Sequence, residues 1–180
     1  MPKVLVPLAQ ECEELEAVTI IDLLRRAEIT VVTAGLDTQP VTCSRQTKLI
    51  PDTDLDTALK EDYDMVVLPG GLPGADHLDN DERIKKLLTK MANSEKFTAA
   101  ICAAPKVLSS AGLLNCKKAT CYPTVLESNN ETNITGEAVV IDGKIITSRG
   151  PGTAMDFALT LIESLEGKEK RDEVEKGLAR

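Results

Sequence analysis

Apolar segments of strand length alternate with amphipathic segments of helical length from one end of this 180-residue chain to the other. The strand-like segments are residues 3–7, 29–34, 65–68 and 97–101, and the helical segments are residues 13–27, 79–93, 103–111 and 153–165. Such alternation predicts an α/β fold built on a mostly parallel sheet. We find no repeat and no low-complexity linker, so we expect one domain over residues 1–180.

Two hairpins are expected beside these elements. Residues 41–43 and 48–50 predict a small antiparallel hairpin, and residues 138–141 and 144–147 predict another that turns at Asp142-Gly143.

Three further local features are expected. Asp79 or Asn80 is the expected N-cap of the 79–93 helix. The charged segment 168–178 favours a peripheral helix, and the polar segment 130–135 favours an exposed loop.

The acidic composition limits the partners of the chain. It has 29 Asp and Glu against 21 Lys and Arg, a formal net charge of −8. This charge disfavours nucleic-acid phosphates and anionic membranes as main partners, and 2% aromatic residues leave few side chains for base stacking. No apolar run approaches the roughly 20 residues of a membrane helix, and residues 1–8 do not resemble a signal peptide. We expect a cytoplasmic protein with reduced thiols, no membrane contact and no sequence-specific nucleic-acid binding.

The chain has one histidine and five cysteines without a CxxC pair, which disfavours a metal site or a disulfide framework. His77 is expected at the surface near a helix start, and Cys116 and Cys121 lack further metal-binding neighbours. We therefore expect neither a metal nor another cofactor, and chemistry performed by thiols, carboxyls and backbone groups.

Cys102 lies directly between a buried strand and a helix, before Ala103-Ala104-Pro105. This position is typical of a nucleophile elbow, in which small neighbours relieve the crowding at a sharp turn. A helix N-terminus aimed at the sulfur would favour thiolate over thiol. The alternative is that Cys102 is a small apolar filler at the end of a strand.

Glu16 belongs to a run of carboxylates that also includes Glu11, Glu13 and Glu14. Acidic residues at a helix start are usually solvated and stabilised by the helix dipole. Because Glu16 is flanked by apolar residues, the alternative is that it points toward the sheet edge and Cys102. A carboxyl buried there would have a raised pKa, stay protonated and act as an acid or base.

Gly70-Gly71 follows the strand-like segment 65–68 and allows backbone to approach a reacting centre. The amides of Gly71 and Ala103 would then form a two-donor oxyanion site. The alternative is an ordinary turn.

Six ordered motifs span nearly the whole chain: EELEAV at 13–18, DLLRRA at 22–27, TCSR at 42–45, VLPGG at 67–71, AAICAAP at 99–105 and TSRGPGT at 147–153. Together they strongly resemble the ThiJ/PfpI superfamily, in the branch of the parkinsonism-associated protein deglycase and bacterial YajL. The resemblance implies a flavodoxin-like three-layer sandwich and a homodimer.

The resemblance also implies roles for individual residues. Cys102 would be the nucleophile, Glu16 its acid or base, and Gly71 and Ala103 the backbone donors. Three arginines match family positions near the site or the dimer interface, namely Arg26, Arg45 and Arg149. One departure is Tyr122, which precedes Pro123 where some relatives have histidine. This substitution disfavours a peptidase that uses a Cys-His pair.

Two functions follow from the resemblance. The first is a cysteine-dependent glyoxalase or deglycase that acts without a cofactor on methylglyoxal, glyoxal or their early adducts with protein and nucleotides. The alternative is a redox-sensing chaperone or protective protein in which Cys102 is oxidised to sulfinate. The sequence leaves open the role of Cys12, and whether the C-terminal segment covers the site.

Overall fold

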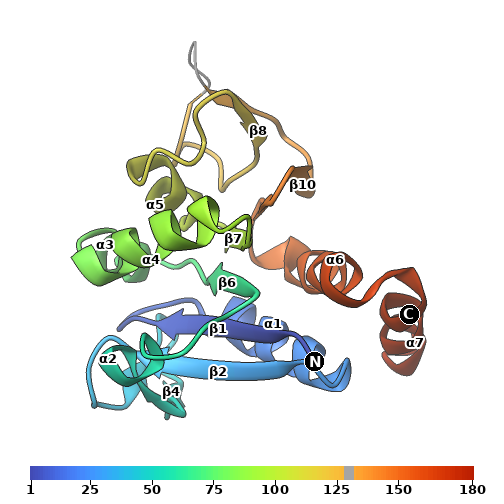
Figure 1. Cartoon of the computed structure of the whole chain (residues 1–180), viewed down its shortest axis with the longest axis horizontal. Helices are drawn as coiled ribbons and strands as arrows, with labels where there is room; N and C mark the ends of the chain where they lie inside the picture. The colour runs from blue at the N-terminus through green and yellow to red at the C-terminus, as the bar shows by residue number, and fades with distance from the viewer. Residues whose placement is uncertain (128–131) are drawn as a thin grey trace.

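The computed structural model describes residues 1–127 and 132–180 (Figure 1). Within these residues a seven-stranded sheet has the order β10-β11-β7-β6-β1-β2-β5. Its strands are β1 (Lys3–Leu8), β2 (Thr30–Gly35), β5 (Thr53–Asp54), β6 (Met65–Leu68), β7 (Phe97–Ile101), β10 (Val139–Asp142) and β11 (Ile145–Ser148). Neighbouring strands are parallel except β10 and β11, which form the antiparallel hairpin predicted around Asp142-Gly143.

Helices cover both faces of the sheet. Alternate residues of β1 divide between the two cores: Val4 and Val6 pack with α1 (Glu14–Arg26), α6 (Ala154–Glu166) and α7 (Lys168–Gly177). Leu5 packs in the opposite core, to which four helices contribute: α2 (Leu55–Ala58), α3 (Gly74–Asp79), α4 (Glu82–Asn93) and α5 (Pro105–Ser110). This division follows from the two-residue period of a strand, and it confirms the predicted three-layer α/β sandwich. None of the helices described here is long and apolar enough to cross a membrane.

Smaller elements lie outside the main sheet. The predicted hairpin is confirmed as β3 (Val41–Thr42) and β4 (Lys48–Leu49). A separate parallel pair forms from β8 (Lys117–Ala119) and β9 (Thr132–Ile134). The loop expected at 130–135 lies partly outside the described residues, and it is wrong for Thr132–Ile134, which form β9. The buried Thr132 hydroxyl donates a 3.0 Å hydrogen bond to the Leu114 carbonyl, which fixes this strand.

The helix expected over residues 79–93 is confirmed as α4, but it begins later, at Glu82, and Asp79 is the last residue of a separate helix, α3. Asp81 is the N-cap of α4, not Asp79 or Asn80, because its carboxylate accepts the Arg83 amide at 2.9 Å. That hydrogen bond satisfies an amide that the helix itself cannot pair. The peripheral helix expected at 168–178 is confirmed as α7.

The parallel strands β1, β6 and β7 end at the same edge of the sheet. Ligand sites of open α/β sheets lie outside the carboxyl ends of their strands. The loops that follow these three strands carry residues 9–13, 69–73 and 102–104, so the topology gathers three of the predicted motifs at one edge.

Candidate active site

Cys102 occupies a strained turn between β7 and α5. Its φ is +63°, a left-handed conformation that residues other than glycine adopt at a cost. Its amide donates to the Ser148 carbonyl at 3.0 Å, and its carbonyl accepts the Tyr122 amide at 2.8 Å. These backbone hydrogen bonds hold the turn, and they confirm the predicted elbow geometry. Cys102 as a whole is buried but 8% accessible.

The helix after the elbow begins later than expected. It starts at Pro105 and not at Ala103, because the Ala104 amide donates to the Ile101 carbonyl at 3.0 Å and closes a tight turn first. Proline is favoured at the first helical position, where an amide would be unpaired.

Glu16 lies in the first turn of α1 and is completely buried. Its neighbour Leu15 is half exposed, so the helix turns the carboxyl inward and a leucine outward. The Gly70 amide donates to Glu16 Oε2 at 2.8 Å, whereas Oε1 has no hydrogen-bond partner of standard geometry among the described residues. The prediction that Glu16 points toward the sheet edge is confirmed.

Neither Gly70 nor Gly71 has room for a side chain, because neighbouring atoms occupy the space that a Cβ would need. A Cβ on Gly70 would lie 2.7 Å from Cys102 Cβ and 2.8 Å from Glu16 Oε2. Gly71 has φ +90°, and a Cβ there would lie 2.5 Å from the Glu13 nitrogen. The turn after β6 therefore has a structural requirement for both glycines.

Burial raises the pKa of the Cys102 thiol and is the largest effect on it, and the charge of an ionised Glu16 raises it further. The backbone amides of Gly71 and Ala103 lower that pKa by smaller amounts. The expectation that the elbow favours thiolate over thiol is therefore wrong, because burial raises the pKa of Cys102 whether or not Glu16 is ionised. Protonation of Glu16 removes the opposing charge.

Burial raises the pKa of Glu16 to about 7, and the Glu13 carboxylate adds to the rise. Hydrogen bonds with Gly70 and Cys102 act in the opposite direction. Because each ionised group of the Glu16–Cys102 pair disfavours ionisation of the other, the pair carries at most one negative charge near neutral pH. A carboxyl that titrates near pH 7 is suited to acid or base catalysis there.

The three predicted arginines occupy different places. Arg149 follows Ser148, whose carbonyl accepts a hydrogen bond from the Cys102 amide. The Arg149 guanidinium donates a hydrogen bond to the Gly136 carbonyl at 2.8 Å. Arg45 is exposed in the β3–β4 turn, where its amide donates to the Glu14 carboxylate at 3.0 Å.

Arg26 ends α1, ten residues after Glu16, which is about 15 Å along a helix. It pairs there with Asp22 at 2.7 Å. Of the three arginines, only Arg149 therefore has a backbone link to the elbow.

His77 is exposed, as expected, but lies in the last turn of α3 and not at a helix start. Its Nε2 is 3.8 Å from the Glu11 carboxylate.

The supporting roles of two residues, Gly70 and Ser148, were not predicted from the sequence. Gly70 positions Glu16 through its amide and also accepts the Glu13 amide at 2.9 Å. Ser148 fixes the elbow backbone, and its hydroxyl lies 2.7 Å from that of Thr153. Both belong to motifs quoted above, so the signal was present in VLPGG and TSRGPGT, although it did not indicate which backbone atom acts.

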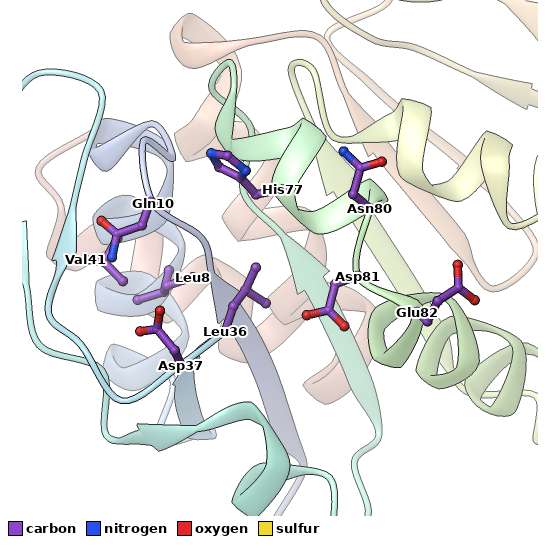
Figure 2. Close-up of a pocket in the computed structure, with 9 residues that line it drawn as sticks. All are labelled: Leu8, Gln10, Leu36, Asp37, Val41, His77, Asn80, Asp81 and Glu82. Atoms are coloured by element: carbon purple, nitrogen blue, oxygen red, sulfur yellow. The ribbon is translucent and has the colours of Figure 1, made fainter.

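A cavity of about 440 Å³ lies above the carboxyl ends of β1 and β2 (Figure 2). It is lined by Leu8, Gln10, Leu36, Asp37, Val41, His77, Asn80, Asp81 and Glu82, so neither Cys102 nor Glu16 lines it. Some polar groups of the cavity already have partners within the protein. Asp81 pairs with Arg83 at 2.6 Å, and the side-chain amide of Gln10 donates a hydrogen bond to the Pro40 carbonyl at 3.0 Å. The cavity is thus separate from the candidate active site.

No group of three or more metal-ligating side chains occurs in the portion of the chain that the structure describes. The groups that the structure brings together at the elbow are one thiol, one carboxyl and two backbone amides. A thiol beside hydrogen-bond donors and a titratable carboxyl can attack an electrophilic carbon and transfer protons.

Comparison with known proteins gives consistent matches. The model of the DJ-1/PfpI family matches residues 2–164. Protein DJ-1 homolog B of Arabidopsis thaliana is 46% identical over 171 residues, which are 94% of this chain and 39% of that protein, so the chain spans about two fifths of that relative. A Caenorhabditis elegans relative named glutathione-independent glyoxalase DJR-1.2 is 36% identical over 94% of this chain and 91% of its own length.

Solved structures agree with the sequence matches. The crystal structure of Drosophila melanogaster DJ-1beta has a TM-score of 0.94 and 43% identity, and covers 99% of this chain and 97% of its own. The structure titled "Toxoplasma gondii DJ-1, oxidized" has a TM-score of 0.95 and 39% identity, and the match covers 99% of this chain and 98% of that one. The chain therefore belongs to the DJ-1/PfpI family.

Proposed function

We propose that the protein is a cysteine-dependent enzyme that converts methylglyoxal, glyoxal or their early adducts on protein and nucleotide groups without a cofactor. The observation that carries this proposal is the proximity of the buried Glu16 carboxyl to Cys102 at the elbow, since a Cβ on Gly70 would lie within 3 Å of both side chains. The backbone amides of Gly71 and Ala103, which lower the pKa of the Cys102 thiol, are the expected oxyanion donors. The C. elegans relative named glutathione-independent glyoxalase supports the same class of reaction.

The reaction begins when the Cys102 sulfur adds to the aldehyde carbon of methylglyoxal and Glu16 accepts the thiol proton. The carbonyl oxygen takes up the electron pair of the broken π bond and becomes an oxyanion. The Gly71 and Ala103 amides stabilise this oxyanion by donating hydrogen bonds to it in place of the sulfur. Glu16 returns the thiol proton to this oxyanion, which gives the hemithioacetal and a free carboxylate. The carboxylate then removes the proton of the first carbon and delivers it to the second carbon, while the hydroxyl proton of the first carbon passes to the oxygen of the second, and the product is a lactoyl thioester. Water cleaves the carbon–sulfur bond and releases lactate and the thiol. The sum adds one water to methylglyoxal and needs no oxidant or reductant.

The direct test is methylglyoxal consumption with lactate detection in the absence of glutathione. We expect turnover by the unmodified chain and only the background rate with Cys102→Ala or Cys102→Ser. Glu16→Gln should reduce kcat about 100-fold or more, because proton transfer by a positioned group contributes at least that much. Full activity in Cys102→Ser would refute the proposal.

A matched control separates the role of Cys102 from a general thiol effect. Cys116 is exposed and, unlike Cys102, does not precede the start of a helix. The Cys116→Ser variant therefore removes one thiol and leaves the elbow unchanged. Its kcat and KM should equal those of the unmodified chain. Circular dichroism of each variant establishes that lost activity does not reflect lost fold.

A second function is favoured by the same donors. If a hydroperoxide oxidises Cys102 to sulfinate, two peroxide molecules each transfer one oxygen to the sulfur and leave as alcohol or water. The Gly71 and Ala103 amides can hold the new oxygens, and protonated Glu16 can donate to them. Mass spectrometry after mild peroxide treatment tests this redox-sensor function, which requires that Cys102 gain two oxygens before exposed Cys116 reacts.

A further inference from the structure

Cys12 and Cys43 form a second thiol site that the proposed reaction does not use. Their sulfur atoms lie 3.8 Å apart, and the two residues are 1% and 0% exposed. Both are free cysteines that come from segments 31 residues apart in the sequence. Contact between two reduced thiols in the interior brings together the two reactants of a disulfide.

Backbone hydrogen bonds hold the two segments in register. The Glu11 amide donates to the Thr42 carbonyl at 2.8 Å, and the Ser44 amide donates to the Cys12 carbonyl at 2.9 Å. These bonds flank the thiol pair and fix the loop before α1 against the end of β3. A disulfide has a sulfur–sulfur distance of about 2.05 Å, so closure requires about 1.7 Å of approach, shared between two side chains.

We propose that Cys12 and Cys43 are a redox-active dithiol, separate from Cys102, which a hydroperoxide converts into an intramolecular disulfide. In the first step one sulfur takes an oxygen from the peroxide, the O–O bond breaks and an alcohol or water leaves. The second sulfur then loses its proton and attacks the sulfenic sulfur, and the S–O bond breaks to release water. The two thiols together lose two electrons and two protons, and the peroxide is reduced.

The contact between the two sulfurs is symmetric, so either thiol can take the first oxygen and the other resolves the sulfenic acid. Burial raises the pKa of both thiols, and the neighbouring Glu14 charge adds to both rises. Because both thiols are buried, the reaction should be slower than oxidation of an exposed cysteine.

The position of the pair gives the bond a structural consequence. Cys12 backbone atoms lie within 3 Å of the positions that a Cβ would take on Gly71 and Gly74. The next residue, Glu13, donates its amide to the Gly70 carbonyl at 2.9 Å. A Cys12–Cys43 disulfide would therefore tie the β3–β4 hairpin covalently to the loop that packs on the Gly70-Gly71 turn.

Peptide mapping tests the proposal without any assay of activity. A Cys102→Ser chain is treated with hydrogen peroxide in native buffer, denatured with N-ethylmaleimide and digested with trypsin. Residues 4–25 and 27–45 form two tryptic peptides that contain Cys12 and Cys43, respectively, as their only cysteines. Because the buried pair reacts more slowly than exposed Cys116, treatment continues well beyond full oxidation of Cys116. We then expect most chains to carry the two peptides joined by a disulfide, with a mass two hydrogens below the sum of the separate peptides, and we expect a phosphine to separate them.

Cys12→Ser supplies the matched control, because Cys43 then lacks its resolving thiol. Its 27–45 peptide should gain two or three oxygens and form no link. The proposal is overturned if both thiols remain fully alkylated at the end of this extended treatment, or if they gain oxygens without a link. A link that appears only after the far-UV circular dichroism signal is lost also overturns it. Because Cys102 is absent throughout, these outcomes do not depend on whether the proposed enzyme activity is correct.

Discussion

The amide of Gly70 donates a 2.8 Å hydrogen bond to Oε2 of Glu16 and thereby joins the turn after β6 to the first turn of α1. The same glycine lacks the atom that would collide with the candidate nucleophile, since its Cβ would lie 2.7 Å from Cys102 Cβ. One position therefore both holds the carboxyl and makes room for the thiol beside it.

Gly70→Ala should damage the site and the fold together. The added methyl would also lie 2.8 Å from the Ile101 carbonyl, and backbone cannot yield as a flexible side chain can. Overpacking of this kind costs about 1–3 kcal/mol, so urea denaturation should show a lower midpoint and methylglyoxal turnover should fall. Gly136→Ala is the control, because nothing lies within 4 Å of its Cβ position. Equal stability of the two variants would contradict the prediction.

Glu16→Gln should change how stability depends on pH. Burial raises the pKa of Glu16 from 4.5 to about 7, so between these values the folded chain holds a proton that the unfolded chain releases. The contribution of Glu16 to the free energy of unfolding is then fully present below about pH 4.5, and it is lost as pH rises through about 7. The loss is at most about 3 kcal/mol.

Urea denaturation of both chains at several pH values between 4.5 and 7 measures this effect. Relative to the unmodified chain, Glu16→Gln should gain stability steadily as pH rises across that window. Glu137→Gln, which alters an exposed carboxyl, should show no such trend. A stability difference between wild type and Glu16→Gln that is independent of pH would mean that the carboxyl is not held protonated.

The sheet and its main helices could be predicted because each depends on a local pattern. The 65–68 run is apolar at every position, and β6 is correspondingly buried throughout. The boundary between α3 and α4 could not be predicted in this way. It depends on Asp81, whose carboxylate accepts both the amide and the guanidinium of Arg83 while Arg83 also contacts Asp56. The short elements β5 and α2, unrecognised in the sequence, have too few residues to show a period.

The candidate site was predictable to a similar degree. Cys102 and Glu16 were recognisable as residue types in motifs, and the structure brings them together. The raised pKa of Glu16 was predicted as a consequence of burial, and burial does raise it to about 7. The expected thiolate of Cys102 was wrong, because burial and the charge of Glu16 raise the pKa of that thiol, and no spacing of residues encodes either effect. The Cys12–Cys43 contact could not be predicted either, because it joins two loops that are 31 residues apart in the sequence. The contact depends on the position of β3 beside the loop before α1, which is a tertiary feature.

Thr147→Val should destabilise the protein although it keeps the side-chain shape. Thr147 is completely buried on β11, and its hydroxyl accepts the Thr120 amide at 2.9 Å. Valine removes the acceptor and leaves a buried amide unpaired, at a cost of about 1–3 kcal/mol. Urea denaturation should show a lower midpoint with an unchanged slope. Thr89→Val is the control because Thr89 is exposed, and a loss there as large as at Thr147 would show that burial is not the cause.

Val18→Glu should weaken the homodimer that the family resemblance implies. Leu15 and Val18 are 51% and 46% exposed on α1, and Ile50 is 85% exposed nearby, beside a hollow of about 280 Å³ that Val18 and Ile50 both line. Exposed apolar side chains that gather on one face mark an interaction surface.

We expect the unmodified chain to have twice its 19.4 kDa mass in light scattering. An unpaired charge at the centre of such an interface costs at least about 2 kcal/mol, or roughly 30-fold in Kd. Ile141→Glu alters an equally exposed residue on the edge strand β10 and should leave the dimer intact. A wild-type chain that stays monomeric, or a Val18→Glu chain that dimerises as tightly, would exclude this face as the interface.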